Sequence, residues 1–347
     1  MTVLANVQPK HAREDRSRIE AAIARAVEFL EARQLPYGEF KTLAASDRLL
    51  KRKARFDSSP FVTAWVVDCL RSWQSPAVRG MMKNAVRYLR REMEGPGLWR
   101  YWSSRNEAHD FLPPDVDDTC CVSAVLQEHG LQPPPNERFI LANRNNEGLF
   151  FTWIVPRDAS PKRMVRDLQP LMEPAAWVVW SMQGLLGNVD PGVNANAVMY
   201  LGERAETRPA IDYLIGVVCG ERSADSPSFY PDAITLHYLV SRAYARGVAA
   251  LGETRGVILQ ALHAQQSRKG VFKNELLTAF AICTLLNFHE CGRILDKPVN
   301  HLLKCQHANG GWRGIGAFLG PAPYYGSDEL TTAVCIQALA RYHATLS

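Results

Sequence analysis

The stretch PPDVDDTCCVSAVL, residues 113–126, is the most informative for the architecture, because it opens a helix that is apolar on almost every side. Three carboxyl groups, Asp115, Asp117 and Asp118, fall within four residues at the start of this helix. A helix cap uses one carboxylate, which satisfies one or two free backbone N–H groups of the first turn. Because a helix that is apolar all round lies in a core, the stretch predicts a buried helix with surplus carboxyl groups.

Further segments have the same character, with a polar opening followed by an apolar helix rich in small and hydroxyl residues. They begin at Asp57, Val189, Tyr230, Lys273 and Gly326. Amphipathic segments alternate with them and begin at Arg18, Val78, Arg208, Leu251 and Lys297. Alternating buried and amphipathic helices require an inner and an outer ring. We therefore predict an all-α fold, with residues 1–347 forming a single (α/α)6 barrel domain; signals for strands are few.

The chain between the second and third inner helices is less regular. A long loop is predicted around residues 143–170, where Asn, Asp, Pro and Ser gather. The apolar helix predicted from Glu173 carries two tryptophans and is expected to pack in the core, with a surface for a membrane or partner as the alternative. Eight cysteines without a Cys-x-x-Cys spacing indicate reduced, mainly buried thiols.

The composition indicates a cytoplasmic protein. Lys and Arg number 40 against 35 Asp and Glu, a mild surplus that gives no reason to expect a nucleic-acid partner. No apolar run is long enough to predict a spanning helix, and the N-terminus lacks the apolar core of a signal peptide. A peripheral membrane contact stays open, because oily substrates reside in membranes. The basic run at 51–55 is interpreted as a solvated loop, with contact to a diphosphate or an anionic membrane as the alternative.

The three carboxyl groups suggest acid chemistry. Crowded carboxylates in a dry site do not all ionise, so at least one is driven towards its protonated form. A carboxylic acid that faces an apolar cavity is positioned to protonate an alkene, which is a very weak base. A neighbouring hydrogen-bond donor would stabilise the carboxylate that remains.

Asp115-Val116-Asp117-Asp118-Thr119 resembles the Asp-x-Asp-Asp-Thr motif of the class II terpene cyclases. With Pro114 before it, the motif is most similar to the version found in squalene–hopene cyclases. The resemblance implies that Asp117 is the general acid and that Asp115 and Asp118 hold it in its reactive conformation. The activity it implies is proton-initiated cyclisation of a linear isoprenoid, a small-molecule partner. Protonation needs no cofactor and no metal ligand is expected, although Mg²⁺ would accompany a diphosphate substrate. The oligomeric state stays open.

A second motif supports the same resemblance. Gln306-x3-Gly310-x-Trp312 is similar to the QW repeat of that superfamily. Degenerate copies are Gly38-Glu39-Phe40, Gly97-Leu98-Trp99, Gly148-Leu149-Phe150 and Gly270-Val271-Phe272. Glycine permits a tight turn and the aromatic ring fills the gap between helices, so we expect a structural role.

Other residues near the openings of the inner helices are candidates for substrate binding. Aromatic candidates for stabilising a carbocation are Tyr324, Tyr325, Tyr230, Trp99, Trp102 and Phe61. Asn194 and Asn196 are candidates for lining the cavity or donating to Asp117, and His109 and His237 for orienting it.

Three alternatives remain open. The spacing of Asp118 and Cys120 matches the zinc ligands of protein-prenyltransferase β subunits, with His237 or His263 as the third ligand. A non-catalytic helical scaffold would use the carboxylates as caps only. An acid-initiated reaction on a non-terpene alkene would keep the acid and change the substrate.

Overall fold

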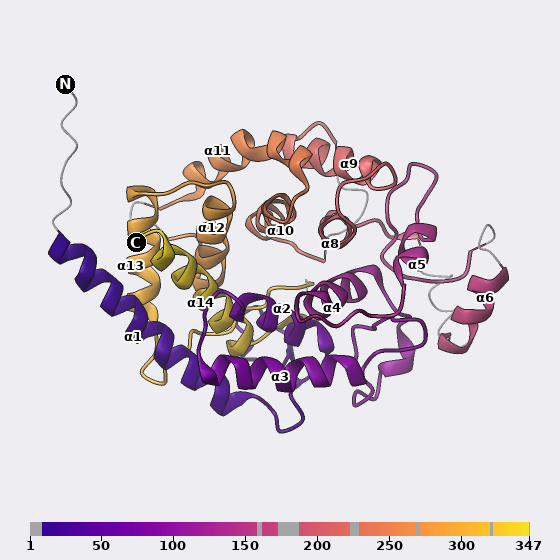
Figure 1. Ribbon diagram of the computed structural model, residues 1–347, viewed down its shortest axis with the longest axis horizontal. Coiled ribbons are helices and arrows are strands. Elements are labelled where there is room, and N and C mark those ends of the chain that lie inside the picture. Colours follow the sequence, from indigo (N-terminus) through magenta and orange to yellow (C-terminus); the bar gives the residue numbers. More distant parts are fainter. Residues whose placement is uncertain are drawn as a thin grey trace.

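The computed structural model describes residues 9–157, 162–172, 187–222, 229–267, 271–319 and 322–346. Within these residues the chain is mainly helical, and the helices form two concentric rings (Figure 1). The buried apolar side chains form one continuous cluster between and inside the rings. No helix in the described ranges is long and apolar enough to cross a membrane.

Among the described residues, six helices form the inner ring, and they correspond to the six buried segments that the sequence predicts. They are α2 (Pro60–Leu70), α4 (Val116–Glu128), α8 (Pro191–Leu201), α10 (Ala233–Ala245), α12 (Glu275–Asn287) and α14 (Asp328–Ala344). Each packs against the next, and α14 closes the ring by packing against α2. The predicted all-α barrel is confirmed.

The outer ring contains the five predicted amphipathic helices. They are α1 (Pro9–Arg33), α3 (Pro76–Arg91), α9 (Arg208–Cys219), α11 (Arg255–Gln265) and α13 (Arg293–Cys305). They pack against α14, α2, α8, α10 and α12 respectively. Short 3₁₀ helices, η1 (His109–Phe111) and η4 (Ala249–Thr254), lie in the connections.

In the described residues between α4 and α8, the chain forms the short helices α5 (Glu137–Ala142) and α6 (Lys162–Leu168). Helix α6 lies at the periphery of the barrel (Figure 1). It falls inside the stretch predicted as a loop around residues 143–170, and the 3₁₀ helix η2 (Gln169–Leu171) overlaps the end of that stretch. The apolar helix predicted from Glu173 lies outside the described residues.

The inner helices begin where the sequence predicts, because polar side chains cap them. Side-chain oxygens accept backbone N–H groups of the first turn at the starts of α2, α4, α8, α12 and α14. The capping residues are Ser59, Asp115, Asp190, Asn274 and Ser327. Each cap typically contributes about 1 kcal/mol of stability. It also fixes the N-terminal end of its helix, which is the end nearest the cavity described below.

A repeated hydrogen bond links the glycine–aromatic turns to the inner ring. The backbone N–H of the aromatic residue donates to a side-chain oxygen in the early turns of the following inner helix, at distances of 2.9 to 3.1 Å. The pairs are Phe40 with Thr63, Trp99 with Thr119, Phe150 with Asn194, Phe272 with Thr278, and Trp312 with Thr332. These hydrogen bonds attach each turn to an inner helix, which is the structural role that the sequence predicts for the glycine–aromatic turns.

The turn at Gly310 shows why glycine is required there. Its φ is +88°, and a Cβ atom would lie 2.2 Å from the backbone oxygen of Arg25 in α1. The amide of Gln306 closes the turn by donating to the carbonyl of Gly310 and to a carbonyl of α1, each at 2.8 Å. Gln34 and Gly38 repeat the arrangement between α1 and α3. Both turns therefore bind successive outer helices together.

Three short strands were not predicted from the sequence. They are β1 (Leu43–Ala45), β2 (Arg55–Phe56) and β3 (Tyr324–Gly326), in an antiparallel sheet of order β2-β1-β3. Strands of two or three residues are too short for an alternating apolar pattern to show. The sheet places the chain before α2 beside the chain before α14.

Candidate active site

A cavity of about 220 Å³ lies at the end of the barrel where the inner helices begin. Its lining is mainly aromatic and aliphatic, with the three carboxyl groups of the motif as its acidic members. The lining residues are Phe61, Tyr101, Trp102, Leu112, Asp115, Asp117, Asp118, Thr152, Trp153, Val193, Phe229, Tyr230, Phe318, Leu319 and Tyr325. The first turn of α4 thus exposes its surplus carboxyl groups to an apolar space.

Asp115 is the N-cap of α4. Its Oδ1 accepts the backbone N–H of Asp118 at 2.7 Å, and its own N–H donates to the carbonyl of Trp99 at 3.1 Å. The neighbouring segment also pairs with it, because Val116 donates to the carbonyl of Thr152. Asp115 is therefore fixed by the backbone on both sides and holds the first turn of α4 in place.

Asp117 is buried, and both of its carboxyl oxygens accept hydrogen bonds. The side-chain N–H of Asn196, on the adjacent helix α8, donates to Oδ1. The hydroxyl of Tyr230, in the segment before α10, donates to Oδ2. Three consecutive inner-helix units thus converge on one carboxyl group that faces the cavity.

A buried ion pair fixes the donor Asn196. Its amide oxygen accepts a hydrogen bond from the guanidinium of Arg242 on α10, which leaves the amide nitrogen to point at Asp117. Arg242 in turn pairs with Asp68 on α2 at 3.2 Å, and both side chains are almost completely buried. The guanidinium carbon also lies 4.8 Å from the ring centre of Trp65. Asp117 is therefore connected to a charged network beneath the cavity.

The surroundings of Asp117 poise it as an acid. Burial raises its pKa to about 6, while the hydrogen bonds from Tyr230 and Asn196 and the charge of Arg242 act to lower it. Burial and the charge of Asp117 raise the pKa of Tyr230 well above its ordinary value, so the phenol stays a neutral donor. With a pKa of about 6, Asp117 keeps a protonated fraction at mildly acidic to neutral pH, and donors are in place to stabilise the anion that proton donation leaves.

Asp115 and Asp118 are neighbouring buried carboxyl groups. Burial raises the pKa of both; the charge of Asp117 raises the pKa of Asp115 further, and the charges of Asp115 and Asp117 raise that of Asp118. The interaction between their side chains lowers the pKa of Asp115 and raises that of Asp118. The interaction between the two side chains therefore favours the proton on Asp118 over Asp115.

Aromatic rings surround the space above Asp117. Phe318 packs edge-on against Phe61 at 5.1 Å and against Tyr230 at 5.7 Å between ring centres. Tyr101 packs in the same manner on Tyr325 at 5.5 Å. The π faces of such rings attract a positive charge, which suits the cavity to a cationic intermediate.

The structure places the predicted substrate-binding residues in two groups. Tyr230, Tyr325, Trp102 and Phe61 line the cavity, and Asn196 contacts Asp117 behind it. Trp99, Asn194 and Tyr324 are not among the described lining residues.

The residues outside the lining have other contacts. The indole N–H of Trp99 donates to the carbonyl of Leu89 at 2.8 Å, and the amide of Asn194 bonds both backbone groups of Phe150. Tyr324 lies in β3, packed over Gly316. Residue type and position near the openings of the inner helices suggested these residues for the site, whereas their contacts hold turns and strands together.

The two histidines considered for orienting Asp117 make other contacts. His109 lies near the carbonyl of Trp102 at 2.9 Å and near Glu94 at 3.3 Å. His237 is buried in α10, and burial lowers its pKa to about 4. Within the described residues, neither histidine donates to Asp117; Asn196 and Tyr230 are its donors instead.

The ligand set of a protein-prenyltransferase-like zinc site is not brought together. Asp118 and Cys120 lie in the first turns of α4, and neither forms a metal-compatible group with His237 or His263 within the described ranges. One group of three ligand-type side chains does occur in those ranges, at Glu275, His301 and Cys305, away from the cavity.

Comparison with known proteins identifies the architecture. No protein-family model and no curated protein matches the sequence. Among solved structures, a protein from Actinoplanes superposes with a TM-score of 0.70 at 17% identity, covering 94% of this chain and 99% of that one. The type II terpene cyclase MstE from Scytonema superposes with a TM-score of 0.68 at 17% identity, covering 95% and 100%. The fold is that of the class II terpene cyclases.

The ent-copalyl diphosphate synthase from Streptomyces platensis superposes less closely, with a TM-score of 0.57 at 16% identity. The match covers 82% of this chain and 50% of that synthase. MstE has been solved with its substrate geranylgeranyl dihydroxybenzoate and with its product merosterolic acid A. The terpene cyclase fold therefore occurs both as one barrel and as part of a longer chain.

Within this terpene cyclase fold, sequence reasoning missed the network beneath the acid. Asp68 and Arg242 are charged residues in helices that are otherwise almost entirely buried, and this mismatch was the available signal. It also missed the lining residues Trp153, Phe229 and Phe318, which lie in connecting segments where no periodicity marks an inward-facing side chain.

Proposed function

We propose that this chain is a class II-type cyclase in which Asp117 protonates a linear isoprenoid. The observation that carries the proposal is the position of Asp117, which faces an apolar, aromatic cavity while Asn196 and Tyr230 donate to its two oxygens. Donors that bind the carboxylate stabilise the product of proton transfer more than the acid itself. This preference is what a strong acid in a dry site requires.

In the first step, the proton of the Asp117 carboxyl forms a C–H bond with the less substituted carbon of the terminal alkene, or an O–H bond with the oxygen of a terminal epoxide. On an alkene the π electrons form the new C–H bond; on an epoxide an oxygen lone pair forms the O–H bond, and the electrons of the breaking C–O bond pass to that oxygen. Either step leaves a tertiary cation on the substrate. The negative charge left on Asp117 is spread over oxygens that already accept from Asn196 and Tyr230. The buried guanidinium of Arg242 adds a positive charge behind Asn196.

In the following steps, an internal alkene attacks the cation and closes a ring, and the charge moves along the folded chain. Phe61, Tyr230 and Phe318 present rings to this path. Loss of a proton from a carbon beside the final cation completes an isomerisation in which the proton gained equals the proton lost. The cavity shape, which holds the chain in its folded conformation, sets the product.

The substrate class follows from the same cavity. Its acidic members belong to the motif itself, so the part of the substrate that enters is hydrocarbon. We expect the polar head group to lie towards the opening. Because MstE binds geranylgeranyl dihydroxybenzoate, a prenylated aromatic acid is a candidate beside prenyl diphosphates. Mg²⁺ would accompany the diphosphates alone, and protonation itself needs no cofactor.

Product analysis tests the proposal. Purified protein and its Asp117→Asn variant are incubated with farnesyl and geranylgeranyl diphosphates with Mg²⁺, squalene, prenylated quinols and geranylgeranyl dihydroxybenzoate. Diphosphate products are dephosphorylated, and all products are separated by gas chromatography–mass spectrometry. A cyclic isomer from the wild type that the variant fails to make supports proton-initiated cyclisation.

An amide in place of Asp117 keeps the size of the side chain and removes the acid, so circular dichroism should show both proteins equally folded. Cyclisation at wild-type rate by Asp117→Asn would overturn the assignment of the acid. Absence of any product from the folded wild type across the whole panel would count against the terpene assignment.

A further inference from the structure

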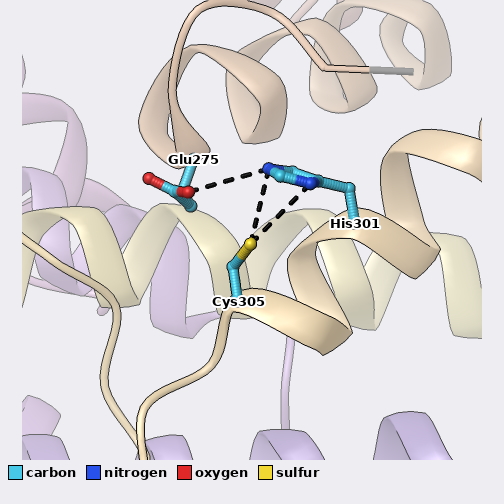
Figure 2. A group of neighbouring side chains, drawn as sticks. All are labelled: Glu275, His301 and Cys305. Carbon is cyan, nitrogen blue, oxygen red and sulfur yellow. Dashed lines mark hydrogen bonds and ion pairs between the residues drawn. The ribbon is translucent and has the colours of Figure 1, made fainter. Parts of the chain in front are cut away.

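A second chemical cluster lies away from the cavity, between an inner and an outer helix. Glu275 is the first residue of α12, whereas His301 and Cys305 lie one turn apart on α13 and face it (Figure 2). The thiol sulfur lies 3.6 Å from Nε2 of His301, and the same nitrogen lies 3.6 Å from Oε1 of Glu275. All three groups are partly buried, and ligand atoms from each lie within 4.8 Å of one another.

These distances fit a metal ion held by sulfur, nitrogen and oxygen. Zinc binds sulfur at about 2.3 Å and nitrogen or oxygen at about 2.0–2.1 Å in tetrahedral geometry. Two corners of that tetrahedron are then about 3.6 Å apart for sulfur and nitrogen, and about 3.4 Å apart for nitrogen and oxygen. The Cys305–His301 separation therefore matches one edge, and the His301–Glu275 separation is close to another.

The cluster is better suited to a metal than to nucleophilic catalysis. A Cys–His–Glu arrangement would also suit an activated thiol, but a nucleophile needs a neighbouring space for its substrate. None of the three side chains lines any of the cavities described in the structure. A thiolate, an imidazole and a carboxylate together favour zinc over the hard ions Mg²⁺ and Ca²⁺, which take oxygen ligands.

We propose that Glu275, His301 and Cys305 form a zinc site that clamps outer helix α13 to inner helix α12. Two ligands come from one face of α13, because residues four apart on a helix are neighbours. The third comes from the start of α12, so the ion joins the two rings of the barrel. The fourth position of the tetrahedron is left for a water molecule.

The place of the clamp in the fold suggests its purpose. Cys305 is the last residue of α13, and the next residue, Gln306, begins the turn that binds α1. Glu275 follows the cap of α12, Asn274. A bound ion would thus fix the end of α13 and the start of α12 together, at the entry to the turn that leads to Trp312.

Metal binding by the purified full-length chain tests the site without any reference to cyclisation. Protein free of affinity tags is stripped with a chelator under reducing conditions and titrated with Zn²⁺ against a chromophoric competitor. We expect one ion per chain, with at least 10-fold weaker binding in Glu275→Gln and loss of the site in Cys305→Ser and His301→Ala. The exposed Cys291 provides the matched control, and Cys291→Ser should bind as the wild type does.

Cobalt gives an independent readout of the ligands. Co²⁺ bound to a thiolate shows a sulfur-to-metal charge-transfer band in the near ultraviolet, which should be present in the wild type and in Cys291→Ser but absent in Cys305→Ser. Circular dichroism of each stripped variant verifies that it is folded. Binding that is unchanged in Cys305→Ser, or no stoichiometric zinc binding by the folded wild type, would overturn the proposal.

Discussion

The side-chain amide of Asn196 donates a hydrogen bond to the carboxyl of Asp117 and so joins two neighbouring inner helices at the centre of the barrel. The other end of the same amide accepts from Arg242, a permanent cation, so the amide cannot reverse without placing its N–H against a guanidinium. The donor to Asp117 is therefore held in place by charge. Preorganised donors of this kind need no reorganisation when negative charge develops on the acid.

Replacing Tyr230 with phenylalanine should slow proton transfer and move its pH dependence. The hydroxyl acts to lower the pKa of Asp117, so its removal raises that pKa above about 6. The active form is the protonated acid, and activity falls as the pH rises through its pKa. We expect kcat to fall by about 10²–10³-fold, the usual effect of losing one such donor, while the descending limb of the pH profile shifts to higher pH.

Measurement of kcat and KM between pH 5 and 9 checks this prediction. A purely structural role for the hydroxyl would lower the amount of folded protein and leave the profile in place. A lower kcat, with the descending limb of the pH profile at the same pH as in the wild type, would show that Tyr230 does not act on the ionisation of Asp117.

Replacing Asp68 with leucine should destabilise the barrel. Asp68 is the carboxylate that pairs with the buried Arg242, and it also pairs with Arg246. Removing one partner of a buried ion pair leaves an uncompensated charge and typically costs about 3–5 kcal/mol. Chemical denaturation of Asp68→Leu at pH 7 measures the loss of unfolding free energy. A loss below about 1 kcal/mol would contradict the conclusion that the buried Arg242 depends on Asp68 for its charge compensation.

The lowered pKa of Asp68 also predicts how the free energy of unfolding depends on pH in the acidic range. Burial alone would raise its pKa, but the guanidiniums of Arg246, Arg242 and Arg71 outweigh burial and lower it below 3.8. A depressed folded-state pKa contributes stability that is present above the unfolded pKa of about 3.9 and lost as the pH falls through the folded value. The stability difference between the wild type and Asp68→Leu should therefore shrink below pH 4.

Replacing Asp118 with asparagine should change the pH dependence of stability at alkaline pH, whereas the contribution of Asp68 is lost in acid. Burial and the neighbouring carboxyl groups raise the pKa of Asp118 well above its ordinary value. A raised folded-state pKa contributes stability that is complete below the unfolded pKa and is lost as the pH rises through the folded one. Asp118→Asn cannot ionise, so its unfolding free energy should fall less steeply than that of the wild type towards alkaline pH.

Denaturation at intervals from pH 5 to 9 would show this difference in slope. The size of the side chain is unchanged, so a difference that does not vary with pH would indicate packing instead of ionisation. Parallel curves for the two proteins would therefore contradict a raised pKa at Asp118.

The inner ring could be predicted from sequence because burial on all sides leaves a pattern within each helix. The acid could be predicted because its three carboxyl groups are adjacent in the chain. The donors to the acid come from other helices, and nothing in their local sequence distinguishes them from caps. Asn194 and Asn196 illustrate this: both are buried on α8, but only Asn196 reaches Asp117, whereas Asn194 holds Phe150.

Contacts between distant residues account for the rest. Asp68 and Arg242 are 174 residues apart, so their pairing depends on closure of the ring and not on any local motif. Glu275 and the pair His301 and Cys305 likewise meet through packing of α12 on α13, at a spacing that matches no short zinc motif. Local patterns predicted the helices, and ring closure determined which polar side chains meet.

The glycine–aromatic links provide a last prediction with an internal control. Thr332 accepts the backbone N–H of Trp312 at 3.0 Å, whereas the hydroxyl of the adjacent Thr331 is buried without a hydrogen-bond partner among the described residues. Valine has nearly the shape of threonine and lacks the hydroxyl. In Thr332→Val the N–H of Trp312 stays buried without an acceptor, which typically costs about 1–3 kcal/mol. In Thr331→Val an unpaired polar group is replaced by an apolar one, so stability should be unchanged or increased. Urea denaturation of the two variants compares neighbouring positions on one helix, and equal losses of stability would show that the link from Trp312 to α14 does not hold the turn.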